Sequence, residues 1–148
     1  MKIEKILVAT DFSETSQAAL EYAKELARSA GAALVVLHVE EDPILNAVST
    51  DQSYRDEADA KTLQRLQTLI ESQEQQRLRA EFAVVHGNAF VEIVRYARDH
   101  GVGMIVLGTH GRTALAHMIL GSVAENVVRT AECPVLTVRH PKLRYQAP

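Results

Sequence analysis

IEKILVAT, from Ile3 to Thr10, is a short apolar segment that is rich in isoleucine and valine. Two segments of the same character, Leu34 to Val39 and Met104 to Leu107, follow after stretches with helical spacing. Short apolar runs without polar alternation are typical of strands that are buried on both faces. The sequence therefore predicts buried strands at these three places.

The segment between the first two strands has the pattern of an amphipathic helix of about four turns. Ser13 or Thr15 can cap its start by accepting hydrogen bonds from the first turn, and Gly31 stands where a helix typically ends. Apolar residues recur there at intervals of three and four: Ala19, Tyr22, Ala23, Leu26, Ala27 and Ala30.

The rest of the chain repeats this alternation of strands and helices. A helix with an apolar stripe of leucines and Ile70 is expected to run to about Gln76, and a third strand to span Ala80 to Val85. Asn88 is expected to cap a third helix, which ends at His100 and Gly101. A fourth helix carries the stripe Leu120, Val123, Ala124, Val127, Val128 and Ala131, and the fifth strand is Pro134 to Val138.

Five strands that alternate with four helices predict an α/β fold in which the strands pair in parallel and helices cover both faces. We expect a single doubly wound domain over residues 1–141, followed by a frayed tail from Lys142 to Pro148. Asp42 to Ser53 has loop composition, and connections of about a dozen residues are uncommon. This segment is interpreted either as a lid or partner contact, or as a tolerated surface excursion.

Composition narrows the classes of function. The chain has 148 residues, 47% hydrophobic and 24% charged, which fits one soluble domain. Cys133 is the only cysteine, so no internal disulfide is possible. A net charge of -3 argues against nonspecific binding to nucleic acid or to anionic membranes. No apolar stretch approaches the ~20 residues of a membrane span and no signal peptide precedes the first strand, so a cytoplasmic location is expected.

Two loops that follow strands hold the candidate site, because ligands of open α/β sheets bind beyond the carboxyl ends of the strands. Thr10 to Ser13 places a carboxylate and two hydroxyls after the first strand. GTHGRT, from Gly108 to Thr113, follows the fourth strand, and Gly121-Ser122 opens the last helix. A glycine loop beside a helix N-terminus forms an anion site that suits a triphosphate. Arg112 can pair with a phosphate, and Ser122 can donate its hydroxyl or cap the helix.

Each of these residues also has a purely structural interpretation. The glycines can simply form a turn, Ser122 can simply cap, and Arg112 can point to water. The chain has no GxxxxGK[ST], no GxGxxG and no GxSxG motif, which argues against a Walker loop, a Rossmann site and a serine-hydrolase elbow. His110 and His117 have no acidic or cysteine partner at ligand spacing, so no metal site made by the protein alone is expected. His110 can touch phosphate or shape the turn.

Gly108, Gly111, Gly121 and Ser122 read as Gly-x2-Gly-x9-Gly-Ser, and this pattern resembles the signature of ATP-binding members of the universal stress protein family. The resemblance covers nearly the whole chain and is carried by KILVATDFS (5–13), LHV (37–39), GSVAE (121–125) and PVLTV (134–138). It implies the strand order 3-2-1-4-5, a homodimer formed through Pro134 to Val138, and ATP as the ligand, with or without Mg²⁺.

The resemblance also implies a set of binding residues. Asp11 and the backbone near Ala9 would bound the adenosine, Val39 would meet adenine through its main chain, and Ser122 would donate to the phosphates. The phosphate cradle would be Gly108, Thr109, His110, Gly111, Arg112, Gly121, Ser122 and Val123. The chain departs from many relatives at Ala9, where they have proline, and at Ala114, where they have glycine.

The leading functional hypothesis is a dimeric, nucleotide-dependent module of stress response or signalling that holds ATP without needing to turn it over. Phosphoryl transfer needs a placed base or water-orienting group, and Asp11 is the one obvious carboxylate near the predicted site. A slow ATPase and an interaction scaffold that binds no nucleotide are the alternatives.

Overall fold

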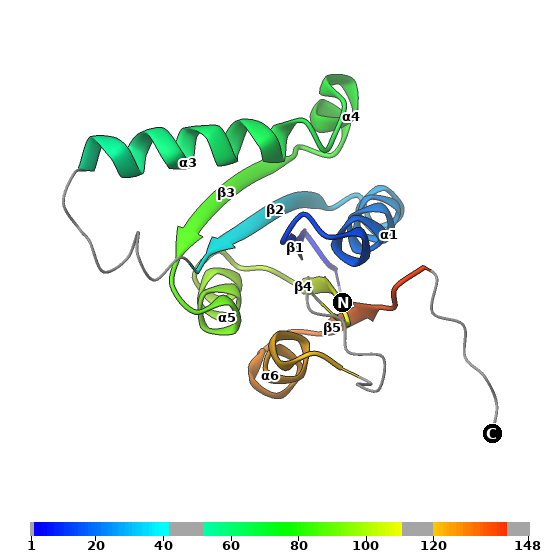
Figure 1. Ribbon diagram of the computed structural model, residues 1–148. Coiled ribbons are helices and arrows are strands. Elements are labelled where there is room, and N and C mark those ends of the chain that lie inside the picture. Colours follow the sequence, from blue (N-terminus) through cyan, green and yellow to red (C-terminus); the bar gives the residue numbers. More distant parts are fainter. Residues whose placement is uncertain (1, 42–51, 111–119, 142–148) are drawn as a thin grey trace.

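Five strands form one sheet in the order β3-β2-β1-β4-β5 in the computed structural model, which describes residues 2–41, 52–110 and 120–141 (Figure 1). Each neighbouring pair is parallel. The strands are β1 (Lys5–Ala9), β2 (Ala33–Glu40), β3 (Glu81–His86), β4 (Met104–Gly108) and β5 (Val135–Val138). This confirms the predicted fold class and strand order, and each strand lies within two residues of its predicted bounds, the usual uncertainty at such ends.

Helices cover both faces of the sheet, as the alternation of elements predicts (Figure 1). One face carries α1 (Glu14–Ala30), α3 (Gln52–Gln67) and α4 (Ser72–Arg77). The opposite face carries α5 (Ala89–Asp99) and α6 (Ser122–Thr130). None of the helices in these described ranges is long and apolar enough to cross a membrane.

The core consists of two clusters, one on each face of the sheet. Along β1, Ile6 and Val8 pack into the cluster beneath α1 and α3, whereas Leu7 packs into the cluster beneath α5 and α6. Successive side chains of a strand point to opposite faces, so a strand covered on both sides needs apolar residues at every position. The central strands therefore read as continuous apolar runs.

The predicted helix ends are largely observed. Ser13 is the N-cap of α1, where its hydroxyl accepts a hydrogen bond from the Ser16 backbone N–H at 3.2 Å. Thr15, the alternative cap, lies inside the helix. Gly31 ends α1 in the left-handed conformation, with φ at 65°. Asn88 caps α5 by accepting from the Val91 N–H at 3.4 Å.

The prediction was wrong for the segment between β2 and β3. The expected single helix is divided, because α3 ends at Gln67 and α4 begins at Ser72. The Thr68 hydroxyl donates to the Arg65 carbonyl at 2.6 Å, and the Gln75 side-chain amide donates to the carbonyls of Gln67 and Ile70 at 2.9 and 2.8 Å. Side chains thus replace the hydrogen bonds that a continuous helix would make.

The expected loop from Asp42 to Ser53 is also shorter than predicted, because α3 already begins at Gln52. The Gln52 side chain donates to the Asp56 carboxylate at 2.9 Å, a contact between neighbouring turns that supports the helix. The remainder of that loop, residues 42–51, and the predicted tail, residues 142–148, lie outside the described residues.

Candidate functional site

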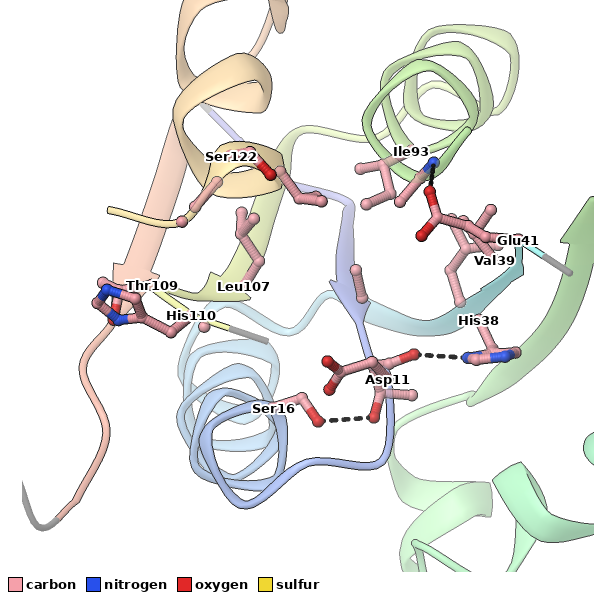
Figure 2. Close-up of a pocket in the computed structure, with 18 of the residues that line it drawn as sticks. Asp11, Ser16, His38, Val39, Glu41, Ile93, Leu107, Thr109, His110 and Ser122 are labelled. Carbon is pink, nitrogen blue, oxygen red and sulfur yellow. Dashed lines mark hydrogen bonds between the residues drawn. The ribbon is translucent and has the colours of Figure 1, made fainter. Parts of the chain in front are cut away.

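A cavity of about 630 Å³ lies at the carboxyl ends of β1, β2 and β4 (Figure 2). The first turns of α1, α5 and α6 complete its wall, through Ser16, Ala89 and the segment 121–124. The strand order reverses here, because the chain passes from β1 to β2 on one side and from β3 across to β4 on the other. Ligands of doubly wound sheets bind at such a reversal. The cavity therefore lies where the fold predicts a site.

The structure brings together every predicted site residue that it describes. These residues all line the cavity: Ala9, Asp11, Val39, Gly108, Thr109, His110, Gly121, Ser122 and Val123. Gly111 and Arg112, the remaining two, lie outside the described residues.

The first turn of α6 opens into this cavity. Gly121 is the N-cap residue and, because it has no side chain, makes no capping hydrogen bond of its own to the turn. The Glu125 N–H is the first of α6 to bond back, to the Gly121 carbonyl at 2.9 Å. The backbone N–H groups of the first three helical residues, Ser122, Val123 and Ala124, therefore have no acceptor within the helix, and all three residues line the cavity. These donors, at the positive end of the helix dipole, favour an anion.

Ser122 corrects one part of the prediction. It is the first residue of α6 rather than its cap, because Gly121 occupies the N-cap position with extended backbone angles. The Ser122 hydroxyl therefore lies in the wall of the cavity and does not cap the start of α6.

The two described glycines of the signature allow the protein's own chain to pack closely. A Cβ atom on Gly108 would meet the Cγ2 atom of Thr15 at 2.6 Å, and one on Gly121 would meet the carbonyl oxygen of Thr109 at 3.0 Å. The Gly121 N–H donates to that same oxygen. These glycines bring β4 against α1 and the start of α6 against the loop after β4, whereas the sequence analysis expected the close approach to involve phosphate.

The opposite wall of the cavity is acidic. Figure 2 shows Val39 and Glu41, at the end of β2, across the cavity from Ser122. The Glu41 carboxylate accepts a hydrogen bond from the Ala89 N–H at 2.7 Å and so ties the end of β2 to the first turn of α5. With Asp11 and Glu40, three carboxylates line the cavity.

Glu40 and Glu41 were missed by the sequence analysis. Among the segments that follow strands, only those after the first and fourth strands were interpreted as part of the site. Ligands of such sheets bind beyond the carboxyl ends of the strands, and this applies equally to β2. The end of the apolar run at Val39, followed directly by two glutamates, was the signal that would have found them.

Hydrogen bonds fix the turn between β1 and α1 on the third side of the cavity. The Thr10 hydroxyl lies 3.0 Å from the Ser16 hydroxyl and accepts from the Phe12 N–H at 3.0 Å. The Asp11 carboxylate accepts from the Ser13 N–H at 3.0 Å. Phe12 has φ at 65°, in a region that costs a residue with a side chain about 1–3 kcal/mol. The surrounding contacts therefore have to hold this turn.

Two histidines that line the cavity, His38 and His110, have structural partners. The His38 Nδ1 atom donates to the Thr10 carbonyl at 2.8 Å, and the residue is buried. His110 is buried, with its Nδ1 atom 3.0 Å from the Thr109 hydroxyl. Among the residues that the structure describes, no group of three His, Cys, Asp or Glu side chains is arranged to hold a metal ion.

A family model described as the universal stress protein family matches residues 2–139. The chain belongs to this family. Universal stress protein YxiE of Bacillus subtilis is 33% identical over 145 residues, which cover 91% of this chain and 98% of the relative. Universal stress protein MJ0577 of Methanocaldococcus jannaschii is 30% identical over 153 residues, covering 92% of this chain and 94% of the relative.

Solved structures of the family share the fold. The structure of MJ0577 has a TM-score of 0.74 to this chain at 30% identity, and the match covers 99% of this chain and 100% of the other. The universal stress protein from Archaeoglobus fulgidus in complex with dAMP has a TM-score of 0.65 at 24% identity and covers 93% and 99% of the two chains. The latter resemblance shows the fold alone.

Proposed function

We propose that this universal stress protein binds ATP in the cavity at the carboxyl ends of β1, β2 and β4, with the phosphates at the first turn of α6. The observation that carries the proposal is the opening of this first turn, which Gly121 cannot cap with a side chain, into the cavity. Ser122, Val123 and Ala124 offer backbone N–H donors, and the Ser122 hydroxyl adds a further donor. Such preorganised donors bind phosphate at little ordering cost.

The opposite wall suits the uncharged part of a nucleotide. Asp11, Glu40 and Glu41 are acceptors, and the ribose hydroxyls and the exocyclic amine of adenine are donors. The same carboxylates repel phosphate, so the charge distribution favours one orientation, with the phosphates at α6. A cavity of about 630 Å³ falls within the range of roughly 300–1,000 Å³ that is usual for small-ligand sites.

Isothermal titration of the purified protein with ATP, with and without Mg²⁺, tests this proposal, and mass spectrometry identifies any ligand that remains bound after purification. Micromolar binding is expected, because many donors are already in place. The absence of heat and of any thermal shift at millimolar ATP would overturn the nucleotide proposal and favour the scaffold. Release of ADP, measured in the same samples, would identify a slow ATPase.

We also infer that the protein is a homodimer that pairs through β5. The carbonyl oxygens of Pro134 and Val138 accept hydrogen bonds from the N–H groups of Ile105 and Thr109, at 3.0 and 2.8 Å. Backbone groups of a strand alternate in direction, so those of Val135 and Thr137 point away from β4. Leu136 is 36% exposed. An apolar edge strand of this kind favours pairing with a second copy.

The backbone directions define the variants that test the dimer. Thr137→Pro removes an N–H that points away from β4, and Leu136→Lys places a charge on the exposed part of the strand. Both are expected to shift the protein toward monomer in light scattering. Val138 is nearly buried in the core, so a charge there would unfold the strand instead of probing the interface. A monomeric parent at high micromolar concentration would overturn this assembly.

A further inference from the structure

The turn between β1 and α1 is held by two side chains from other parts of the fold. His38, on β2, is 8% exposed, and its ring centroid lies 4.9 Å from that of Phe12. Arg65, on α3, places its guanidinium carbon 3.7 Å from the centroid of the same Phe12 ring. Phe12 is the residue of this turn that has a positive φ. Contacts from β2 and α3 thus converge on the strained position.

His38 also holds the backbone of the turn. Its Nδ1 atom donates to the Thr10 carbonyl at 2.8 Å, and the Thr10 N–H donates to the Leu37 carbonyl at 2.9 Å. Both backbone groups of Thr10 are therefore bonded to β2, the N–H to the strand and the carbonyl to the imidazole. Figure 2 shows the bond at His38 as a dashed line. The next residue is Asp11, which lines the cavity. The direction in which Asp11 leaves β1 depends on these bonds.

We infer that His38 is a positioning residue for the nucleotide site, which holds the Thr10–Phe12 turn and so keeps Asp11 at the cavity, and that Arg65 assists by holding the Phe12 ring. This inference rests on the proposed function. It differs from a purely structural role because it ties nucleotide affinity to one hydrogen-bond donor, whereas a structural role ties only stability to it.

Two substitutions of His38 separate these roles. His38→Asn keeps an N–H donor near the position of Nδ1, whereas His38→Leu keeps the bulk and removes the donor. Isothermal titration with ATP, well below the melting temperature of each variant, is expected to show roughly tenfold weaker binding for His38→Leu, the size of a lost hydrogen bond. His38→Asn should bind within about threefold of the parent, since a neutral hydrogen bond of this kind is retained.

Arg65 is tested by Arg65→Met, which keeps the aliphatic stem and removes the guanidinium. Its expected effect is a loss of roughly threefold in ATP affinity, as for a partly exposed cation–π contact. Leu66→Ala is the control: Leu66 neighbours Arg65 on α3, is fully buried in the core, and does not line the cavity. It should lower the melting temperature and leave the affinity for ATP unchanged.

A spectroscopic signal checks the hydrogen bond directly. The imidazole N–H of a buried histidine that donates to a carbonyl gives a slowly exchanging low-field proton resonance, which is expected in the parent and absent from His38→Leu. If the parent binds ATP and His38→Leu binds equally well, or if His38→Asn is as weak as His38→Leu, the inference is wrong. If Leu66→Ala loses as much affinity as His38→Leu, stability explains the effect and the inference is also wrong. A parent that binds no ATP instead overturns the proposed function on which the inference rests.

Discussion

The two ends of the sheet treat their polar groups differently. At the end where the strands begin, Lys24 lies 3.0 Å from Glu74 and 3.1 Å from Glu21, and Arg28 contacts the same Glu74. Gly31 closes α1 with its own backbone bonds. The charges and helix termini at this end therefore satisfy one another.

At the end where the strands finish, polar groups gather around a cavity instead. The first turn of α6 receives no cap from Gly121, and the carboxylates of Asp11, Glu40 and Glu41 line the cavity. Proteins break such local rules mainly at functional sites and compensate elsewhere in the fold. The comparison teaches that ion pairs gather at one end of the fold, whereas the proposed nucleotide site lies at the other.

The largest effect is expected from a negative charge at the uncapped turn. Ser122→Asp should weaken ATP binding roughly 100-fold, because a carboxylate there repels phosphate across a short distance. The same change should leave the melting temperature equal or slightly higher, since an acidic residue in a first turn stabilises a helix by about 0.3–1 kcal/mol. Isothermal titration and thermal unfolding measure the two effects.

Ser122→Asn is the matched control, because asparagine has nearly the same size as aspartate and carries no charge. It should lose only a small part of the affinity. Unchanged ATP binding by Ser122→Asp would mean that the phosphates do not lie at α6, and the contrast between the two ends would then lose its functional meaning.

The second effect compares one glycine from each end. In Gly108→Ala the new Cβ atom would press on Thr15 at 2.6 Å, so the variant should lose about 1–3 kcal/mol of stability and also bind ATP more weakly. Gly31→Ala meets no atom within 4 Å but forces alanine to φ near 65°, which costs about 1 kcal/mol. Urea unfolding should show both losses, whereas titration should show a binding loss only for Gly108→Ala. Equal binding by the two variants would contradict the comparison.

Much of the fold, and part of the candidate site, could be predicted from the sequence. The helix ends at Ser13, Asn88 and Gly31 were predicted correctly, because capping depends on local chemistry within three or four residues. The apolar runs predicted a sheet that is buried on both faces. The rule that ligands bind beyond the carboxyl ends of the strands predicted that Asp11 and Gly108 lie beside the same cavity. The strand order, however, came from the resemblance to the family, since periodicity does not encode which strands are neighbours.

Other features depended on contacts between distant residues. The division between α3 and α4 rests on the Gln75 side chain reaching back to Gln67 and Ile70, which no helical pattern encodes. The same holds for Glu41, whose partner is the Ala89 N–H on another element. Side-chain contacts longer than one helical turn set the first feature, and a contact between two elements sets the second.

The third effect concerns a capped helix at the cavity end. Asn88→Ala removes the side chain that accepts from the Val91 N–H, and should cost about 1 kcal/mol of stability. ATP affinity should stay the same, because Glu41 still accepts from the Ala89 N–H and keeps the start of α5 in place. Paired unfolding and titration experiments check this. A large loss of affinity would show that α5, too, takes part in binding through its first turn.

The smallest effect tests the ion pairs at the opposite end. Burial alone would raise the pKa of Glu74, but hydrogen bonds from Lys24 and Arg28 outweigh it and lower that pKa below its usual 4.5. Burial likewise opposes the charge of Lys24, yet bonds to Glu74 and Glu21 raise its pKa above 10.5. A lowered carboxyl pKa stabilises the folded state above the unfolded value, and this stability disappears as the pH falls through the folded pKa. A raised lysine pKa stabilises the folded state below pH 10.5, and this stability is lost as the pH rises through the folded pKa.

Glu74→Gln should therefore lower the melting temperature between about pH 4.5 and 10.5. The difference from the parent should disappear as the pH falls below this window and should only shrink above it, where Lys24 loses its charge but Arg28 keeps its own. The expected shift is only about 1–2 °C, because partly exposed ion pairs are screened by solvent. It should shrink further in 1 M salt, where charges are screened within roughly 3 Å. Affinity for ATP should not change at any pH in this window. A melting difference that persists at pH 3 would attribute the role of Glu74 to packing, and a change in ATP affinity would show that the two ends of the sheet are energetically coupled.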